Sequence, residues 1–255
     1  MNSSSLLKAL GATAAATVLT LVGSTAASAG SSPAPVSPYI VGGGQASEDY
    51  AFMASLHANG GFHCGASLVS PDVAVTAAHC VEGAVEYAVR VGSAHRSSGG
   101  ETSTVGEVLV HPEYDFAVLR LTEPVQAQPI TIADEAPAGT PTRLLGWGQV
   151  TPERGADEGS ESLKELDTTL VDSGCTSISP QGELCVDSPL DENGDPQGAC
   201  YGDSGGPAIV RVADQWQLIG ATSRGGNDSL TCAEAPSIYT DVTALRDFVE
   251  SALNN

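Results

Sequence analysis

Basic residues are scarce in this sequence. Its 255 residues include 10 lysines and arginines against 31 aspartates and glutamates, a formal net charge of −21. Nucleic acids and anionic membrane surfaces attract proteins through clusters of cationic side chains. The charge therefore argues against nucleic acid and membrane as partners, and we interpret the acidic excess as a solvated surface that keeps the protein soluble.

Aromatic residues are also few, at 5% of the chain, whereas hydrophobic residues reach 41%. That share is enough for a mainly aliphatic core and excludes intrinsic disorder. Paired Cys-x-x-Cys motifs, which are typical of structural zinc sites, are missing. We therefore expect no metal and no other cofactor. The six cysteines are even in number and indicate disulfides in an exported chain, although sequence alone does not choose their pairing.

One apolar run lies near the N-terminus. Residues 9–22 are small and apolar, and Ala27-Ser28-Ala29 has the small-residue pattern that signal peptidase recognises. The run is shorter than the roughly 20 apolar residues of a membrane-spanning helix. We therefore expect a signal peptide over residues 1–29, a Pro- and Ser-rich pro-segment over residues 30–39, and a secreted, extracellular protein.

Short β-prone runs follow, separated by Gly, Pro, Asn and Asp, and indicate an all-β fold. The predicted strands are Phe52–His57, Val73–Thr76, Tyr87–Val91, Thr104–His111, Phe116–Leu121, Thr142–Leu145, Asp167–Val171, Ala208–Val212, Trp216–Thr222 and Ser237–Thr240. Apolar residues at helical spacing from Leu245 to Ala252 predict one C-terminal α-helix, with Asp241 or Thr243 as its cap. A cluster of prolines in residues 122–141 marks the expected boundary between two halves of a domain over residues 40–255.

The sequence Gly-Asp-Ser-Gly-Gly-Pro at residues 202–207 sets the Ser204 hydroxyl between glycines. A backbone that aims the amides of Gly202 and Ser204 at a developing oxyanion needs conformations that a Cβ would obstruct. The other reading of the fragment is a glycine-rich turn with an incidental serine. The same letters fit the nucleophile elbow of α/β-hydrolases, in which the acid and the histidine follow the serine. Because no histidine follows His111, that fold is nearly excluded.

The general base must therefore lie upstream of Ser204. His79 ends a β-prone run within Thr-Ala-Ala-His-Cys, and a disulfide at Cys80 would fix the backbone that carries the imidazole. Asp115 stands directly before the β-prone run Phe116–Leu121, which can carry a carboxylate inward. His79 and Asp115 are our candidates for the base and its orienting acid.

These motifs resemble those of the chymotrypsin-like serine proteases in content and in order. They are IVGG from Ile40, TAAHC, DFAVLRL, GWG at residues 146–148, GDSGGP, and a late Ser-x-Gly. The match runs from Ile40 to the C-terminus. It implies two six-stranded antiparallel β-barrels packed perpendicular to each other, and a serine endopeptidase that forms an acyl-enzyme.

The resemblance also implies the role of each site residue. Ser204 would be the nucleophile, His79 the base and Asp115 the orienting acid, and the amides of Gly202 and Ser204 would form the oxyanion hole. A zymogen is implied, in which cleavage after Tyr39 frees the Ile40 ammonium to pair with Asp203. The implied disulfides are Cys64–Cys80, Cys175–Cys185 and Cys200–Cys232.

The expected primary pocket is uncharged. Trypsin-like members carry an aspartate at the position of Gly198, and the neighbouring Ala199, Gly225 and Ser237 add no charge. A basic side chain would lose its hydration there unpaired, so we expect aromatic or large aliphatic substrate residues. Ser223 is expected to align the substrate backbone.

Arg224 departs from the family pattern, which commonly has tryptophan at this place. Two interpretations of Arg224 stay open. In the first, its positive charge favours acidic substrate residues near the cleavage site. In the second, its side chain points into solvent or pairs with one of the many carboxylates of the protein.

The expected partners are protein or peptide substrates and proteinaceous protease inhibitors, and the expected state is a monomer. A protease-like binding module that has lost catalysis is the rival reading. Such modules usually show a broken triad or oxyanion loop, whereas both motifs are intact in this sequence.

Overall fold

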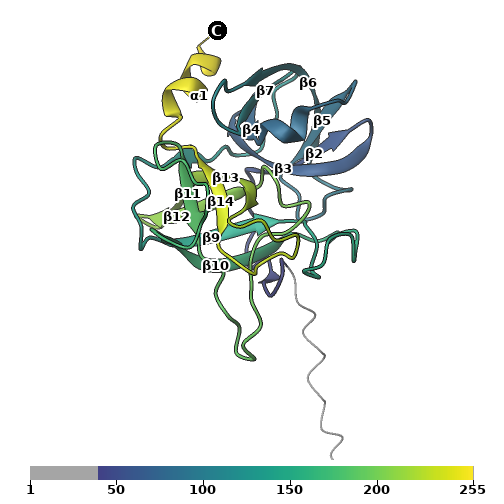
Figure 1. Cartoon of the computed structure of the whole chain (residues 1–255). Coiled ribbons are helices and arrows are strands. Elements are labelled where there is room, and N and C mark those ends of the chain that lie inside the picture. Colours follow the sequence, from purple (N-terminus) through teal and green to yellow (C-terminus); the bar gives the residue numbers. More distant parts are fainter. Residues whose placement is uncertain (1–39, 255) are drawn as a thin grey trace, which may run out of the picture. The chain divides into compact units, whose positions relative to one another are not determined.

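The computed structural model describes residues 40–254, drawn in colour in Figure 1. The expected signal peptide and pro-segment lie outside these residues. Within the described range the regular secondary structure is mostly strands, with a 3-10 turn η1 (Ala78–Val81) and one α-helix, α1 (Arg246–Leu253). No helix in this range is long and apolar enough to cross a membrane.

Six antiparallel strands of the N-terminal half close into a first barrel in the order β2-β3-β4-β7-β6-β5. Closure leaves no edge strand unpaired, and alternate side chains point into the barrel. The interior is aliphatic, with fully buried Leu56, Leu68, Val75 and Leu119. The strands are β2 (Met53–Ala58), β3 (Gly61–Ser70), β4 (Val73–Thr76), β5 (Tyr87–Val91), β6 (Glu101–Val110) and β7 (Ala117–Leu121).

A second barrel follows, in teal to yellow in Figure 1, in the order β10-β11-β14-β13-β12-β9 and closed by the pairing of β9 with β10. Its core includes Leu144, Val186, Ile219 and Tyr239. The short strands β1 (Gly44–Gln45) and β8 (Thr131–Ile132) lie outside this ring on β10 and β13. The ring strands are β9 (Pro141–Gly146), β10 (Lys164–Val171), β11 (Glu183–Val186), β12 (Pro207–Val212), β13 (Gln215–Gly225) and β14 (Ser237–Asp241).

The predicted fold, two six-stranded antiparallel barrels with a C-terminal helix, is therefore confirmed. Each predicted strand corresponds to a barrel strand, but β3 and β11 were not predicted. The glycines of β3 are typical of turns, and for this reason the strand was not predicted. In the structure, however, a Cβ on Gly65 would lie 2.7 Å from the Cα of Gly206 in the other half of the molecule. Close approach of two backbones, rather than a turn, explains that glycine.

The predicted helix cap was wrong. Helix α1 begins after Leu245 without a capping side chain. Asp241 lies at the end of β14, too far upstream, and its Oδ1 accepts the amides of Thr243 and Ala244 in the preceding turn.

Three disulfides join Cys64 to Cys80, Cys175 to Cys185 and Cys200 to Cys232. These are the pairs that the resemblance implies. The first ties β3 to η1, which carries His79, and the third ties the segment before Ser204 to the loop that leads to β14.

Candidate active site

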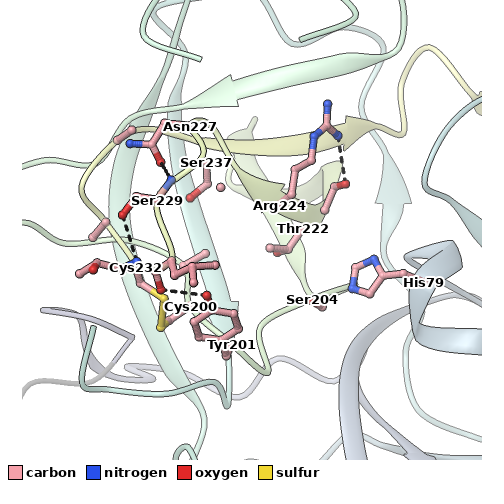
Figure 2. Close-up of a pocket in the computed structure, with 17 residues that line it drawn as sticks. His79, Cys200, Tyr201, Ser204, Thr222, Arg224, Asn227, Ser229, Cys232 and Ser237 are labelled. Carbon is pink, nitrogen blue, oxygen red and sulfur yellow. Dashed lines mark hydrogen bonds between the residues drawn. A yellow bond between two sulfur atoms is a disulfide. The ribbon is translucent and has the colours of Figure 1, made fainter. Parts of the chain in front are cut away.

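A cavity of about 300 Å³ opens beside His79 and Ser204, and Figure 2 shows these two side chains together at one end of it. The remaining lining comes from residues 199–201, 222–225 and 227–237. His79 belongs to the first half of the chain and Ser204 to the second. Their backbones are linked nearby, since the amide of Gly65 in β3 donates to the carbonyl of Ser204 over 2.8 Å.

Ser204 lies in a tight turn before β12. Gly202 has φ +95° and Gly205 has φ +73°, conformations that favour glycine. A Cβ on Gly205 would also lie 2.1 Å from the hydroxyl oxygen of Thr76. The amides of Gly202 and Ser204 donate to no other described residue. The turn thus presents two unused N–H groups beside the serine.

The imidazole of His79 is fixed by Asp115. Its Nδ1 lies 2.8 Å from Asp115 Oδ2, and its main-chain amide donates to Oδ1 of the same carboxylate over 3.0 Å. Because an ionised carboxylate only accepts, Nδ1 carries the proton and Nε2 remains the basic nitrogen. The hydrogen bond that His79 donates to Asp115 raises the pKa of His79 above its ordinary 6.5, although burial opposes this.

Asp115 lies directly before β7 and is held from the second barrel. Ser223 Oγ donates to its Oδ2 over 2.6 Å, and Thr240 Oγ1 donates to its main-chain carbonyl over 2.8 Å. Burial by itself would raise the pKa of Asp115, but the hydrogen bonds from His79 and Ser223 outweigh it and lower the pKa. Asp115 is therefore ionised at neutral pH and able to stabilise a charged imidazole.

Asp203 is buried, with 2% of its surface exposed. Its oxygens accept the amides of Gly148, over 2.7 Å, and Cys200, over 2.9 Å. No ion pair to a described cationic side chain forms there, and burial raises its pKa to about 6. The glycines of the GWG motif make this position possible, because a Cβ on Gly146 would lie 1.9 Å from the Asp203 carboxylate. The GWG motif was noted in the sequence, but its role in leaving space for the Asp203 carboxylate was not predicted.

Ile40 is also buried, with 1% of its surface exposed. The carbonyl of Val41 accepts the amide of Gly198 over 2.9 Å, two residues before Cys200. The start of the described chain therefore packs against the segment that leads to Asp203.

Five of the six residues predicted to bind substrate line the cavity: Ala199, Ser223, Arg224, Gly225 and Ser237. Gly198 does not. A Cβ at Gly198 would come within 2.9 Å of Ser188 Oγ and 3.2 Å of the Cβ of Ala233, a residue that lines the cavity. The hydroxyl of Ser223 is turned to Asp115.

Arg224 pairs with a carboxylate, as the second of the two interpretations of this residue expects. Its Nη1 and Nη2 donate to Glu183 Oε1 and Oε2 over 2.6 and 3.0 Å. The Glu183 side chain is 6% exposed and also accepts the amide of Ser179. Nothing in the sequence singled out Glu183 among the acidic residues. Tyr201, which also lines the cavity, was missed in the same way, and its hydroxyl donates to the carbonyl of Leu230.

Among the described residues one cluster, Cys64, His79 and Cys80, has side chains close enough to share a metal ion. Both cysteines belong to one disulfide and have no thiolate to offer. The cluster therefore provides a single imidazole.

Comparison with known proteins gives consistent matches over most of the chain. The model of the trypsin family matches residues 40–249. The chain is 34% identical to a trypsin of Saccharopolyspora erythraea over 238 residues, which cover 84% of this chain and 98% of that protein. It is 32% identical to a vitellin-degrading protease of Bombyx mori over 229 residues, covering 80% and 81%. It is 28% identical to chymotrypsin-like elastase family member 3B of Macaca mulatta over 220 residues, covering 76% and 84%.

Proposed function

This chain belongs to the trypsin family and is a serine endopeptidase, and on that premise we propose that it cleaves peptide bonds with Ser204, His79 and Asp115. The observation that carries the proposal is the double hydrogen bond of Asp115 to His79, at the end of the cavity that Ser204 lines. In the proposed reaction, all proton transfers within the protein take place among these three residues.

The proposed reaction begins with attack of Ser204 Oγ on the scissile carbonyl, while His79 Nε2 takes the hydroxyl proton. The imidazolium that results is stabilised by Asp115, which keeps the Nδ1 proton in place. His79 then delivers its proton to the leaving amine, and an acyl-enzyme remains. Water then attacks the acyl carbon while His79 Nε2 takes one of its protons. The ester bond to Ser204 Oγ breaks, His79 returns the proton to Oγ, and the carboxylic acid leaves.

The oxyanion hole is proposed to consist of the amides of Gly202 and Ser204. These two N–H groups have no acceptor among residues 40–254 and lie on a turn held by glycines, so they suit a negative charge that develops beside the nucleophile.

Activation by cleavage between Tyr39 and Ile40 is proposed in addition. It is supported by the buried position of Ile40 and by the buried Asp203 carboxylate, whose charge lacks a cation among the described side chains. A new α-ammonium at Ile40 would compensate that charge. Secretion is proposed from residues 1–29 of the sequence.

The primary pocket is proposed to accept aromatic or large aliphatic residues. Support comes from a lining of small or uncharged side chains, with the guanidinium of Arg224 neutralised by Glu183. The proposed partners are protein or peptide substrates and proteinaceous inhibitors that occupy the same cavity, bound by a monomer. Cleavage of a peptide library by the processed enzyme tests the pocket, and dominant cleavage after Lys or Arg would refute it.

Covalent labelling tests the catalytic assignment. The chain cleaved before Ile40 is treated with a fluorophosphonate probe, alongside Ser204→Ala and the matched control Ser229→Ala, which removes another hydroxyl that lines the cavity. We expect the parent and Ser229→Ala to be labelled and to cleave peptide substrates, and Ser204→Ala to do neither. Labelling of Ser204→Ala at the parental rate would reject the proposal.

A further inference from the structure

Strand β13 contains a bulge at the edge of the cavity. Its pairing with β14 shifts between Thr222, opposite Tyr239, and Arg224, opposite Ile238. Consecutive residues of a regular strand point to opposite faces, and a bulge re-aims one of them. At this bulge the side chains of Ser223 and Arg224 meet, with Arg224 Nη1 3.3 Å from Ser223 Oγ. The dashed line at the Arg224 guanidinium in Figure 2 is this contact.

The contact completes a continuous chain of hydrogen bonds that ends at the imidazole. Glu183 holds Arg224 through two bonds of 2.6 and 3.0 Å, and Arg224 reaches Ser223. Ser223 donates to Asp115 Oδ2 over 2.6 Å, and the same oxygen lies 2.8 Å from His79 Nδ1.

The direction of each bond follows from the groups involved. A hydroxyl has one proton, and Ser223 must give it to Asp115, because an ionised carboxylate only accepts. The Ser223 oxygen can then only accept from Arg224, because a guanidinium has only N–H donors. Removal of the guanidinium would leave the Ser223 oxygen without this donor, and the hydroxyl would be held by its bond to Asp115 alone.

We propose that Arg224 is a positioning residue for catalysis: anchored by Glu183, it orients the Ser223 hydroxyl toward Asp115 and so sets how Asp115 holds His79. The proposal rests on the proposed catalytic roles of His79 and Asp115. Arg224 would then have a function beyond its ion pair with Glu183 at the cavity wall.

The chain of hydrogen bonds from Glu183 through Arg224, Ser223 and Asp115 to His79 is called the relay below. The charges around His79 determine how a change in the relay should shift the pKa of the imidazole. Asp115 and Glu82 act on the imidazole directly, and both favour its protonated form. The relay adds a compensated pair, Arg224 with Glu183. Loss of the Glu183 charge alone leaves an uncompensated cation next to Ser223, which disfavours the imidazolium of His79.

The first test is Glu183→Gln, which keeps the shape of the side chain and an acceptor for Arg224. The matched control is Asp167→Asn, which removes the same charge from the bidentate pair of Arg143 outside the cavity. We expect the acid limb of the kcat/KM profile to move to lower pH by about half a unit in Glu183→Gln, and to stay at the parental pH in Asp167→Asn. An equal shift in both variants, or in neither, would overturn the relay.

The second test is the double variant Glu183→Gln with Arg224→Gln, which contains no unpaired charge and keeps the test in place if the single variant fails to fold. We expect its acid limb to return to the parental pH and its kcat on a short peptide substrate to fall on the order of fivefold, with KM within twofold. A raised KM with parental kcat would assign Arg224 to substrate binding instead and overturn the proposal.

The experiments distinguish a failure of the proposed catalytic residues from a failure of the proposed role of Arg224. If Ser204→Ala keeps the activity, the proposed catalytic residues are wrong. If Ser204→Ala is inactive while Glu183→Gln behaves as Asp167→Asn does, only the relay is wrong.

Discussion

Asp115 holds both the side chain and the main chain of His79, through hydrogen bonds to Nδ1 and to the amide nitrogen. One carboxylate thus fixes the tautomer of the ring and the backbone on which the ring is mounted.

The activity should depend on a neutral His79, since a general base must be unprotonated to accept a proton. Because Asp115 raises the pKa of His79, we expect the acid limb of kcat/KM to lie above pH 6.5. Asp115→Asn removes the charge that favours the imidazolium, so the limb should move to lower pH. We also expect kcat to fall by orders of magnitude, because Asp115 no longer holds the reactive tautomer of His79. Asp72→Asn, an exposed change in the same barrel, should leave the profile unchanged. A limb below pH 6 in the parent would contradict the assignment.

The disulfide Cys64–Cys80 should matter for both stability and activity. It anchors η1, the turn that carries His79, to β3. Replacement of both cysteines by alanine should lower the free energy of unfolding by about 2 to 4 kcal/mol and lower kcat as well. The control Cys175→Ala with Cys185→Ala removes a disulfide outside the cavity and should lower stability with a smaller loss of kcat. Denaturant unfolding and steady-state kinetics measure the two effects, and equal kcat in both double variants would contradict the anchoring role.

The uncleaved precursor should become less stable as pH rises through 6. Burial raises the pKa of Asp203 from 3.8 to about 6, so between these values the folded state binds more protons than the unfolded state, and stability falls with rising pH. The Ile40 ammonium of the cleaved chain should offset this loss. In a Ser204→Ala background, we expect the cleaved form to gain up to about 3 kcal/mol over the precursor between pH 4 and 7.

A cleaved chain with one extra alanine before Ile40 serves as the control for that measurement. Its ammonium is displaced from the buried position, so it should follow the precursor. Parallel stability curves for the cleaved form and the precursor would reject the pairing of Ile40 with Asp203.

A carboxylate at Ser237 should change the substrate preference, whereas one at Gly198 should not. Ser237 lines the cavity, so Ser237→Asp offers a charge to an incoming lysine or arginine and should raise kcat/KM for such substrates at least about tenfold. A Cβ at Gly198 would crowd Ser188 Oγ and the Cβ of Ala233, so we expect Gly198→Asp to destabilise the fold without this gain. Matched substrates that differ in one residue measure both, and a gain in Gly198→Asp alone would reverse the assignment.

The all-β fold, the order of most strands, and Ser204 as the candidate nucleophile could be predicted from the amino-acid sequence. These predictions depend on short β-prone runs, on turn residues between the strands, and on the absence of any histidine after His111. Strand β3 was not predicted, because its Gly65 is required by the close approach of a backbone from the other half of the molecule, which local sequence does not show.

The contacts between distant residues could not be predicted from the sequence. The amide of Gly148 reaches Asp203 across 55 positions, Arg224 reaches Glu183 across 41, and Ser223 reaches Asp115 across 108. Local sequence patterns contain no information on such pairs, because it is the closure of the two barrels that brings them together. The same closure turns the Ser223 hydroxyl toward Asp115.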